Sequence, residues 1–171
     1  LLFEHDTLTE DLDLTFKLHR NDFKIVYDKE AIVYTQDPAT MSSYINQMRR
    51  WHSGGWQNLK KHRSVFNRLT NSLQLSLSYI EGVFFSLAIF ITPLLNLEAF
   101  FYMLLIYLIF SLTLGAYASI RRKRIDLLLY SPLYLFVVFT NAWIFLEQFV
   151  KEIIFSKNNL VWYHPERRAI N

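Results

Sequence analysis

Two different parts of the chain meet at Gln47-Met48-Arg49-Arg50-Trp51-His52-Ser53-Gly54-Gly55. Residues 1–69 are rich in charged and polar side chains, whereas the chain beyond them is mostly apolar. Paired guanidinium groups suit an anionic leaving group, and an indole face suits a flat sugar ring. Arg and Trp also gather at membrane surfaces without binding a ligand. The stretch therefore predicts either a binding site or a membrane anchor.

The composition narrows the class of protein. Apolar residues make up 52% of the 171 residues, which is too many for a disordered chain. The net charge of +3 is too small and too dispersed to indicate a nucleic-acid partner, and it fits anionic lipid or sugar-nucleotide phosphates equally well. The absence of cysteine excludes disulfides, thiolate metal sites and a cysteine nucleophile.

The front part of the chain predicts a mixed α/β structure. Thr9 is a suitable cap for a helix that begins with Glu10-Asp11 and ends near Arg20. Two runs of strand-forming residues follow, at 23–27 and 31–35. Thr40 then caps a second helix, which we expect the pair Gly54-Gly55 to interrupt.

The back part predicts a membrane region. Residues 56–71 predict a basic amphipathic helix on the cytoplasmic membrane surface. Three apolar runs, at 73–95, 99–120 and 127–149, are each long enough to span a bilayer. Residues 121–124 are all basic, and basic residues also precede the first span. Because positive charge gathers on the cytoplasmic side of a membrane, we expect both segments to lie on that side. Three spans would place the basic tail, residues 151–171, on the opposite side, so the side of the tail stays open.

Carboxylates supply the candidate chemistry. Asp11, beside Glu10, is a candidate general base if the fold points it into a cleft, although both acids would also stabilise a helix start. Asp11 and Asp13 are two residues apart on a helix, so they face different sides and do not predict a shared metal ion. Glu81 lies within an apolar run and predicts either a polar path or a side chain that reaches the surface.

Two motifs in this order resemble a known family. Thr9-Glu10-Asp11 followed by Gln47-x-x-Arg50-Trp51, just before membrane spans, resembles the processive family-2 glycosyltransferases, which include the cellulose, chitin, hyaluronan and poly-N-acetylglucosamine synthases. The resemblance implies that residues 1–55 are the C-terminal part of a GT-A-like α/β catalytic domain. Residues 56–71 would be the interfacial helix, residues 72–150 the transmembrane helices and residues 151–171 the tail.

The resemblance also implies a role for each motif. Asp11 would be the catalytic base, with Glu10 beside it, and the acceptor hydroxyl would attack a nucleotide-activated sugar with inversion. The residues implied at the substrate are Gln47, Arg49, Arg50, Trp51 and Gly54. A Mg²⁺ or Mn²⁺ ion on the diphosphate is implied as well, but we expect no metal ligand in this chain, because the family's D-x-D motif would precede Thr9. The chain is then part of a longer enzyme or needs a partner chain.

The form Arg50-Trp51-x-x-Gly54-Gly55 and the ending Trp162-Tyr163-His164-Pro165-Glu166-Arg167 look most like the poly-N-acetylglucosamine synthases. This resemblance implies a UDP-N-acetylglucosamine donor and an extracellular, biofilm-type polysaccharide. It also implies a multi-pass cell-membrane protein with a cytoplasmic catalytic part and accessory synthase subunits. Two alternatives stay open, a non-processive enzyme acting on a lipid acceptor and a membrane scaffold without catalytic activity.

Overall fold

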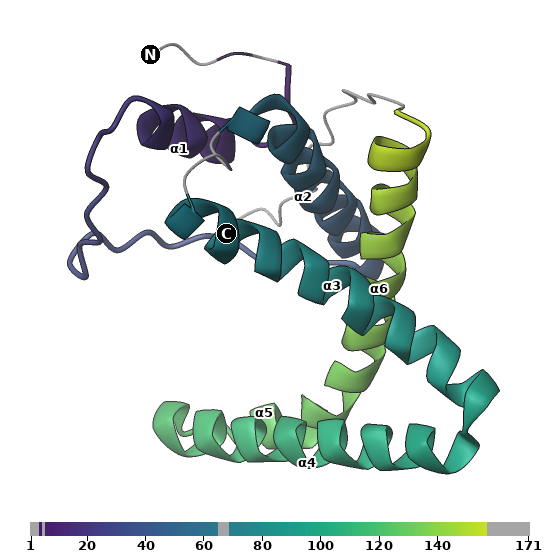
Figure 1. The fold of residues 1–171 in the computed structure, drawn as a ribbon. Helices are drawn as coiled ribbons and strands as arrows, with labels where there is room; N and C mark the ends of the chain where they lie inside the picture. Colours follow the sequence, from purple (N-terminus) through teal and green to yellow (C-terminus); the bar gives the residue numbers. More distant parts are fainter. Residues whose placement is uncertain (1–3, 5, 65–68, 157–171) are drawn as a thin grey trace. The chain divides into compact units, whose positions relative to one another are not determined.

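A computed structural model describes residue 4, residues 6–64 and residues 69–156, with only the backbone course for 69–76. These residues form two compact units, one comprising the chain up to Ile80 and from Ile144 onward, the other Glu81–Trp143. The helical elements, shown in Figure 1, are α1 (Glu10–Arg20), α2 (Met41–Lys61), α3 (Leu69–Leu95), α4 (Leu97–Arg122), α5 (Asp126–Tyr130), the 3₁₀ turn η2 (Ser131–Leu133), α6 (Tyr134–Phe149) and the π-helical turn η3 (Val150–Ile154).

The first unit is built around α2, which contacts both α1 and η3. Its apolar centre is an aromatic cluster in which the ring of Trp56 lies 4.8 Å from that of Tyr79, 5.3 Å from Phe145 and 5.1 Å from Phe149. These rings are tilted or edge-on to one another, the arrangement that aromatic pairs prefer. The cluster joins the end of α6 to the middle of α2.

Helix α2 begins as expected but is longer than predicted. The Thr40 hydroxyl accepts a hydrogen bond from the Ser43 N–H at 3.2 Å, which caps the first turn. The helix then continues through Gly54-Gly55 to Lys61, so the predicted interruption is wrong and the predicted boundary after residue 55 falls inside one helix. Tertiary contact outweighs the poor helix propensity of glycine, about 1 kcal/mol each, because both glycines are buried against other segments.

The predicted α/β fold is wrong for the part of the chain that is described, which contains helices and no strand. The strand-forming runs at 23–27 and 31–35 are extended coil, and their side chains are largely exposed, with Tyr27 at 90% and Tyr34 at 93%. Strand propensity reflects the fit of a side chain to a paired, half-buried sheet. Neither run has such a partner among the described residues.

The second unit contains α4, α5 and η2, and α4 contacts both of the others. Asn96 caps α4 by accepting the Ala99 N–H at 3.0 Å, and Lys123 ends it in the left-handed region, with φ 54°. Gly115 packs closely against Ser131. A Cβ added to this glycine would lie only 2.5 Å from the Ser131 Cβ. Small residues thus allow α4 and the following turn to approach closely.

Three helices are long and apolar enough to cross a membrane, namely Leu77–Leu95, Leu97–Arg122 and Asp126–Ile154. They overlap the predicted spans at 73–95, 99–120 and 127–149. Most of their large apolar side chains are exposed in the structure, as a lipid-facing surface requires, and Glu81 is exposed as well. The motif at 162–167 lies outside the described residues.

Candidate active site

Asp11 occupies the first turn of α1, and its side chain is exposed. One carboxylate oxygen accepts a hydrogen bond from the Leu12 N–H at 2.8 Å. No described lysine, arginine or histidine forms an ion pair with this carboxylate, which lies where the helix dipole favours negative charge. Glu10, its neighbour, is half-buried.

Thr9 contacts α2 rather than capping α1. Its hydroxyl makes no capping hydrogen bond, contrary to the sequence prediction. It instead accepts the Asn58 side-chain amide at 3.0 Å, and the Thr9 carbonyl oxygen accepts the same amide at 3.2 Å. The third acceptor of this amide is the Gly54 carbonyl oxygen, at 3.0 Å. Asn58, which is 0% exposed, thus attaches the start of the acidic motif to α2.

Gly54 makes this attachment possible. A Cβ at Gly54 would lie 2.5 Å from the Thr9 Oγ1 and 2.7 Å from its Cγ2, distances that real Cβ contacts do not reach. Only glycine lets the short side chain of Thr9 lie this close to the helix backbone. The structure therefore gives Gly54 a packing role, and its predicted contact with substrate stays a prediction.

The Gln47-x-x-Arg50-Trp51 motif lies on the same face of α2 as the Thr9 contact. Residues three and four apart share a helix face, so Gln47, Trp51 and Gly54 follow one another along one side. Gly54 is one turn beyond Arg50, about 6 Å along the axis. Trp51 is 49% exposed, and Gln47 and Arg50 are half-buried. Thr9 of the acidic motif thus contacts the face of α2 that carries the arginine–tryptophan motif.

Comparison with known proteins gives the family of the chain. Residues 2–146 match glycosyl transferase family group 2, which is well over half of the chain. The chain belongs to this family. A glycosyltransferase requires a nucleotide-sugar donor and an acceptor, and the three candidate spans fit a membrane-bound member. No curated protein and no solved structure gives a significant match.

Arg49 of the glycosyltransferase lies on another side of α2 from Arg50. Its Nε donates to Glu147 Oε2 at 2.9 Å, and Lys151 Nζ lies 2.5 Å from Glu147 Oε1. Arg49 was predicted at the substrate, but in the structure it forms an ion pair with the end of α6. Its predicted substrate contact remains a prediction, and the observed contact is structural.

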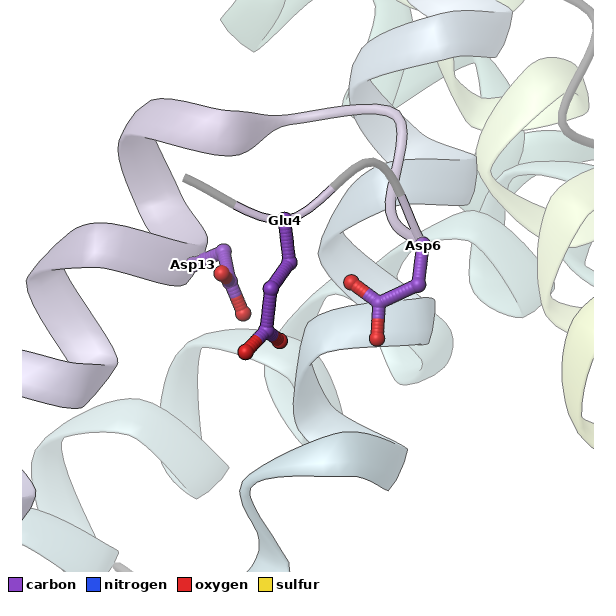
Figure 2. A group of neighbouring side chains, drawn as sticks. All are labelled: Glu4, Asp6 and Asp13. Carbon is purple, nitrogen blue, oxygen red and sulfur yellow. The ribbon is translucent and has the colours of Figure 1, made fainter. Parts of the chain in front are cut away.

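A charged cluster fixes α1 against the end of α2. Figure 2 shows its three carboxylates, Glu4, Asp6 and Asp13, pointing toward one another. Lys61 Nζ lies 2.6 Å from Glu4, 2.7 Å from Asp6 and 2.9 Å from Asp13. His62, whose ring stacks on Phe16, is 2.7 Å from Asp13 through its Nε2. Asp13 is 1% exposed, whereas Asp11 is exposed, so the two acids face different sides of α1 as predicted.

This cluster does not fit a divalent metal ion. Its ligand atoms lie within 4.8 Å of one another, a spacing that would suit a cation. The ammonium group of Lys61, however, is in contact with all three carboxylates and already neutralises them. Lys17 adds a second ammonium at 2.7 Å from Asp13. The charged cluster of Glu4, Asp6 and Asp13 is therefore not a donor set for Mg²⁺ or Mn²⁺.

The charged cluster predicts acid-sensitive stability. Burial alone would raise the pKa of Asp13, but hydrogen bonds from Lys17, Lys61 and His62 outweigh it and lower the pKa from 3.8 to about 2. A carboxyl group whose pKa is lowered by folding stabilises the fold at pH values above its ordinary pKa. This stabilisation is lost as the pH falls through about 4 toward 2. In Asp13→Asn, the unfolding temperature should depend less on pH between about 4 and 2 than it does in wild type. The exposed Asp37→Asn should keep the wild-type slope, and equal slopes for all three proteins would contradict the assignment.

Two residues of this site were missing from the sequence predictions. Both are buried polar residues of α2, Asn58 and Gln57. Asn58 donates to the Thr9 carbonyl oxygen, as described above. Gln57 accepts a hydrogen bond from the Leu8 N–H at 3.1 Å. The available signal was the spacing of Asn58, which is four residues beyond Gly54 and so on the same face. Gln57 gave no comparable signal.

Proposed function

We propose that the chain is part of a membrane-bound, inverting and processive glycosyltransferase. It transfers N-acetylglucosamine from UDP-N-acetylglucosamine to a growing extracellular polysaccharide. The observation that supports this best is the contact of Thr9 with Gly54 and Asn58. It attaches the segment carrying Asp11 to the helix face carrying Arg50 and Trp51.

In this proposal Asp11 is the general base. Its carboxylate takes the proton of the acceptor hydroxyl, whose oxygen forms a bond to the anomeric carbon while the bond from that carbon to the diphosphate breaks. The exposure of Asp11 supports the role, because a base must reach its substrate. Nothing in the described chain neutralises Asp11 as Lys61 neutralises Asp13.

Arg50, Gln47 and Trp51 hold the two substrates. The Arg50 guanidinium suits the charge that develops on the departing diphosphate, and Gln47 lies one turn before it on the same face. The exposed Trp51 offers its ring to the terminal sugar of the acceptor. A Mg²⁺ or Mn²⁺ ion would neutralise the diphosphate when bound, and we predict its ligands upstream of Thr9 in the intact enzyme.

The test uses the full-length enzyme in membranes, supplied with UDP-N-acetylglucosamine. Wild type should release UDP and form polymer. Trp51→Ala should give short chains or none while donor hydrolysis continues, because stacking holds the acceptor and not the donor. Trp51→Phe keeps a flat ring and should retain most of the product length.

Each part of the proposal has an outcome that contradicts it. Unchanged product length in Trp51→Ala would exclude the stacking role. Transfer from other nucleotide sugars, with none from UDP-N-acetylglucosamine, would exclude the donor. A single sugar on a lipid would replace the processive reading with the lipid-acceptor alternative.

A further inference from the structure

Glu152 is a buried carboxylate at the end of the last candidate span. It lies in η3, and the residue is 1% exposed. Its Oε1 accepts hydrogen bonds from the Ser53 hydroxyl and from Gln57 Nε2, the latter at 2.9 Å. Lys60 Nζ donates to the Glu152 carbonyl oxygen at 3.1 Å. The residue thus makes three contacts with α2.

Gln57 extends these contacts to the acidic motif. Its amide nitrogen donates to Glu152, and its amide oxygen accepts the Leu8 N–H at 3.1 Å. A carboxylate only accepts hydrogen bonds, so it fixes which end of the Gln57 amide points toward Leu8. Leu8 directly precedes Thr9-Glu10-Asp11. The hydrogen bonds therefore run without a break from the last span to the segment carrying the proposed base.

We propose that Glu152 is a positioning residue for sugar transfer, which through Gln57 holds the backbone before Asp11 against α2. This inference rests on the proposed function of Asp11. Glu152 touches no substrate in the proposal and acts through other residues. It also lies beyond residues 2–146, the part of the chain that matches the family.

The burial of Glu152 argues against a role in stability alone. Its Oε2 is buried and has no hydrogen-bond partner among the described residues. A buried acceptor without a partner is costly, and replacing a buried polar group together with its partners by apolar side chains is often neutral or stabilising. An arrangement that gives up stability in this way is typical of a site where geometry matters.

The test compares three variants of the full-length enzyme, measured for transfer rate and unfolding temperature. Glu152→Met keeps the size and removes both acceptor oxygens, Glu152→Gln keeps one acceptor, and Glu98→Met removes an exposed acid of α4 as the control. We expect Glu152→Met to lower kcat by about 10- to 100-fold, since a shift of about 1 Å at a catalytic group costs up to that much. The donor KM should stay near wild type. The unfolding temperature should fall only modestly, because Ser53 and Gln57 lose their acceptor while Gln57 Nε2 still donates to Ser53.

Rescue and coupling complete the test. Glu152→Gln should recover most of kcat, and Glu98→Met should leave it unchanged. Gln57→Leu should lower kcat as Glu152→Met does, and the double variant should be no worse than either alone, because both break the same connection. A fall in unfolding temperature large enough to unfold the enzyme at the assay temperature, or an additive double variant, would overturn the positioning role.

Hydrogen exchange separates this inference from the proposed function. The Leu8 amide should be protected in wild type and should exchange faster in Glu152→Met, whether or not the protein transfers sugar. An inactive wild type would overturn the proposed function and leave this readout intact. Unchanged exchange at Leu8 in Glu152→Met would overturn the inference even in an active enzyme.

Discussion

Replacing Asp11 with Asn in the full-length enzyme should lower the rate of sugar transfer by about 10²- to 10⁴-fold, the usual contribution of a general base. The amide has nearly the size of the carboxylate and keeps an oxygen that can accept the Leu12 N–H, so the fold should be retained. It cannot take a proton from the acceptor hydroxyl at neutral pH. The measurement is the initial rate of transfer from UDP-N-acetylglucosamine in isolated membranes.

The matched control is Glu30→Gln, which removes another exposed carboxylate, from a turn in the segment between α1 and α2. Its transfer rate should match that of wild type. Donor binding by Asp11→Asn should also stay near the wild-type value, because the base acts on the acceptor. If Asp11→Asn transfers sugar at the wild-type rate, Asp11 is not the general base; if the wild-type enzyme itself transfers no sugar, the membrane-scaffold alternative gains support.

Substituting Gly54 with Ala should disrupt the attachment of the acidic motif to α2. The new Cβ would overlap the Thr9 side chain, which is β-branched and hydrogen-bonded and so has little freedom to move. Overpacking costs about 1–3 kcal/mol, and Ala returns about 1 kcal/mol of helix propensity. We therefore expect a loss of up to about 2 kcal/mol in the free energy of unfolding. The transfer rate should fall by on the order of 100-fold, because Asp11 shifts with Thr9.

A second substitution tests the cause of that loss. Thr9→Ala in the Gly54→Ala background removes Oγ1 and Cγ2, the two atoms that the new methyl group would strike. The closest remaining contact, to the Thr9 Cβ, is 3.0 Å, which a small shift relieves. Transfer rate and unfolding temperature, measured for both singles and the double, should show partial recovery. No coupling between the two positions would contradict the packing role.

The apolar helices were the part of the fold that the sequence predicted well. A run of about 20 apolar residues is a local signal that needs no knowledge of the rest of the chain. The span predicted at 99–120 lies within α4, Leu97–Arg122. Asn96 caps the start of this helix, and Lys123 ends it in the left-handed conformation. The last span was predicted to end at 149, whereas the helical run continues through η3 to Ile154.

The errors concern contacts between distant segments. Residues 23–27 and 31–35 have strand-forming side chains, but a strand also needs a neighbour, and pairing cannot be deduced from local composition. Gly54-Gly55 was predicted as a break because glycine is a poor helix former. The contacts that outweigh this, with Thr9 and Tyr79, come from residues 45 and 24 positions away.

In the candidate site, too, local features were predictable from the sequence and contacts between distant residues were not. Helical spacing predicts that Gln47, Arg50 and Trp51 share a face, and α2 presents them so. The pairing of Arg49 with Glu147 and of Gln57 with Glu152 joins residues more than 90 positions apart. No periodicity of the sequence encodes such pairs, so Glu152 was read only as part of the basic tail.

The close approach of Thr9 to Gly54 has a consequence for the divergence of related sequences. A larger residue at position 54 is tolerated only after the residue at position 9 has become smaller, whereas a smaller residue at position 9 can arise first at low cost. The order of the two changes is therefore constrained, and the two positions should vary as a pair among relatives that keep this helix contact.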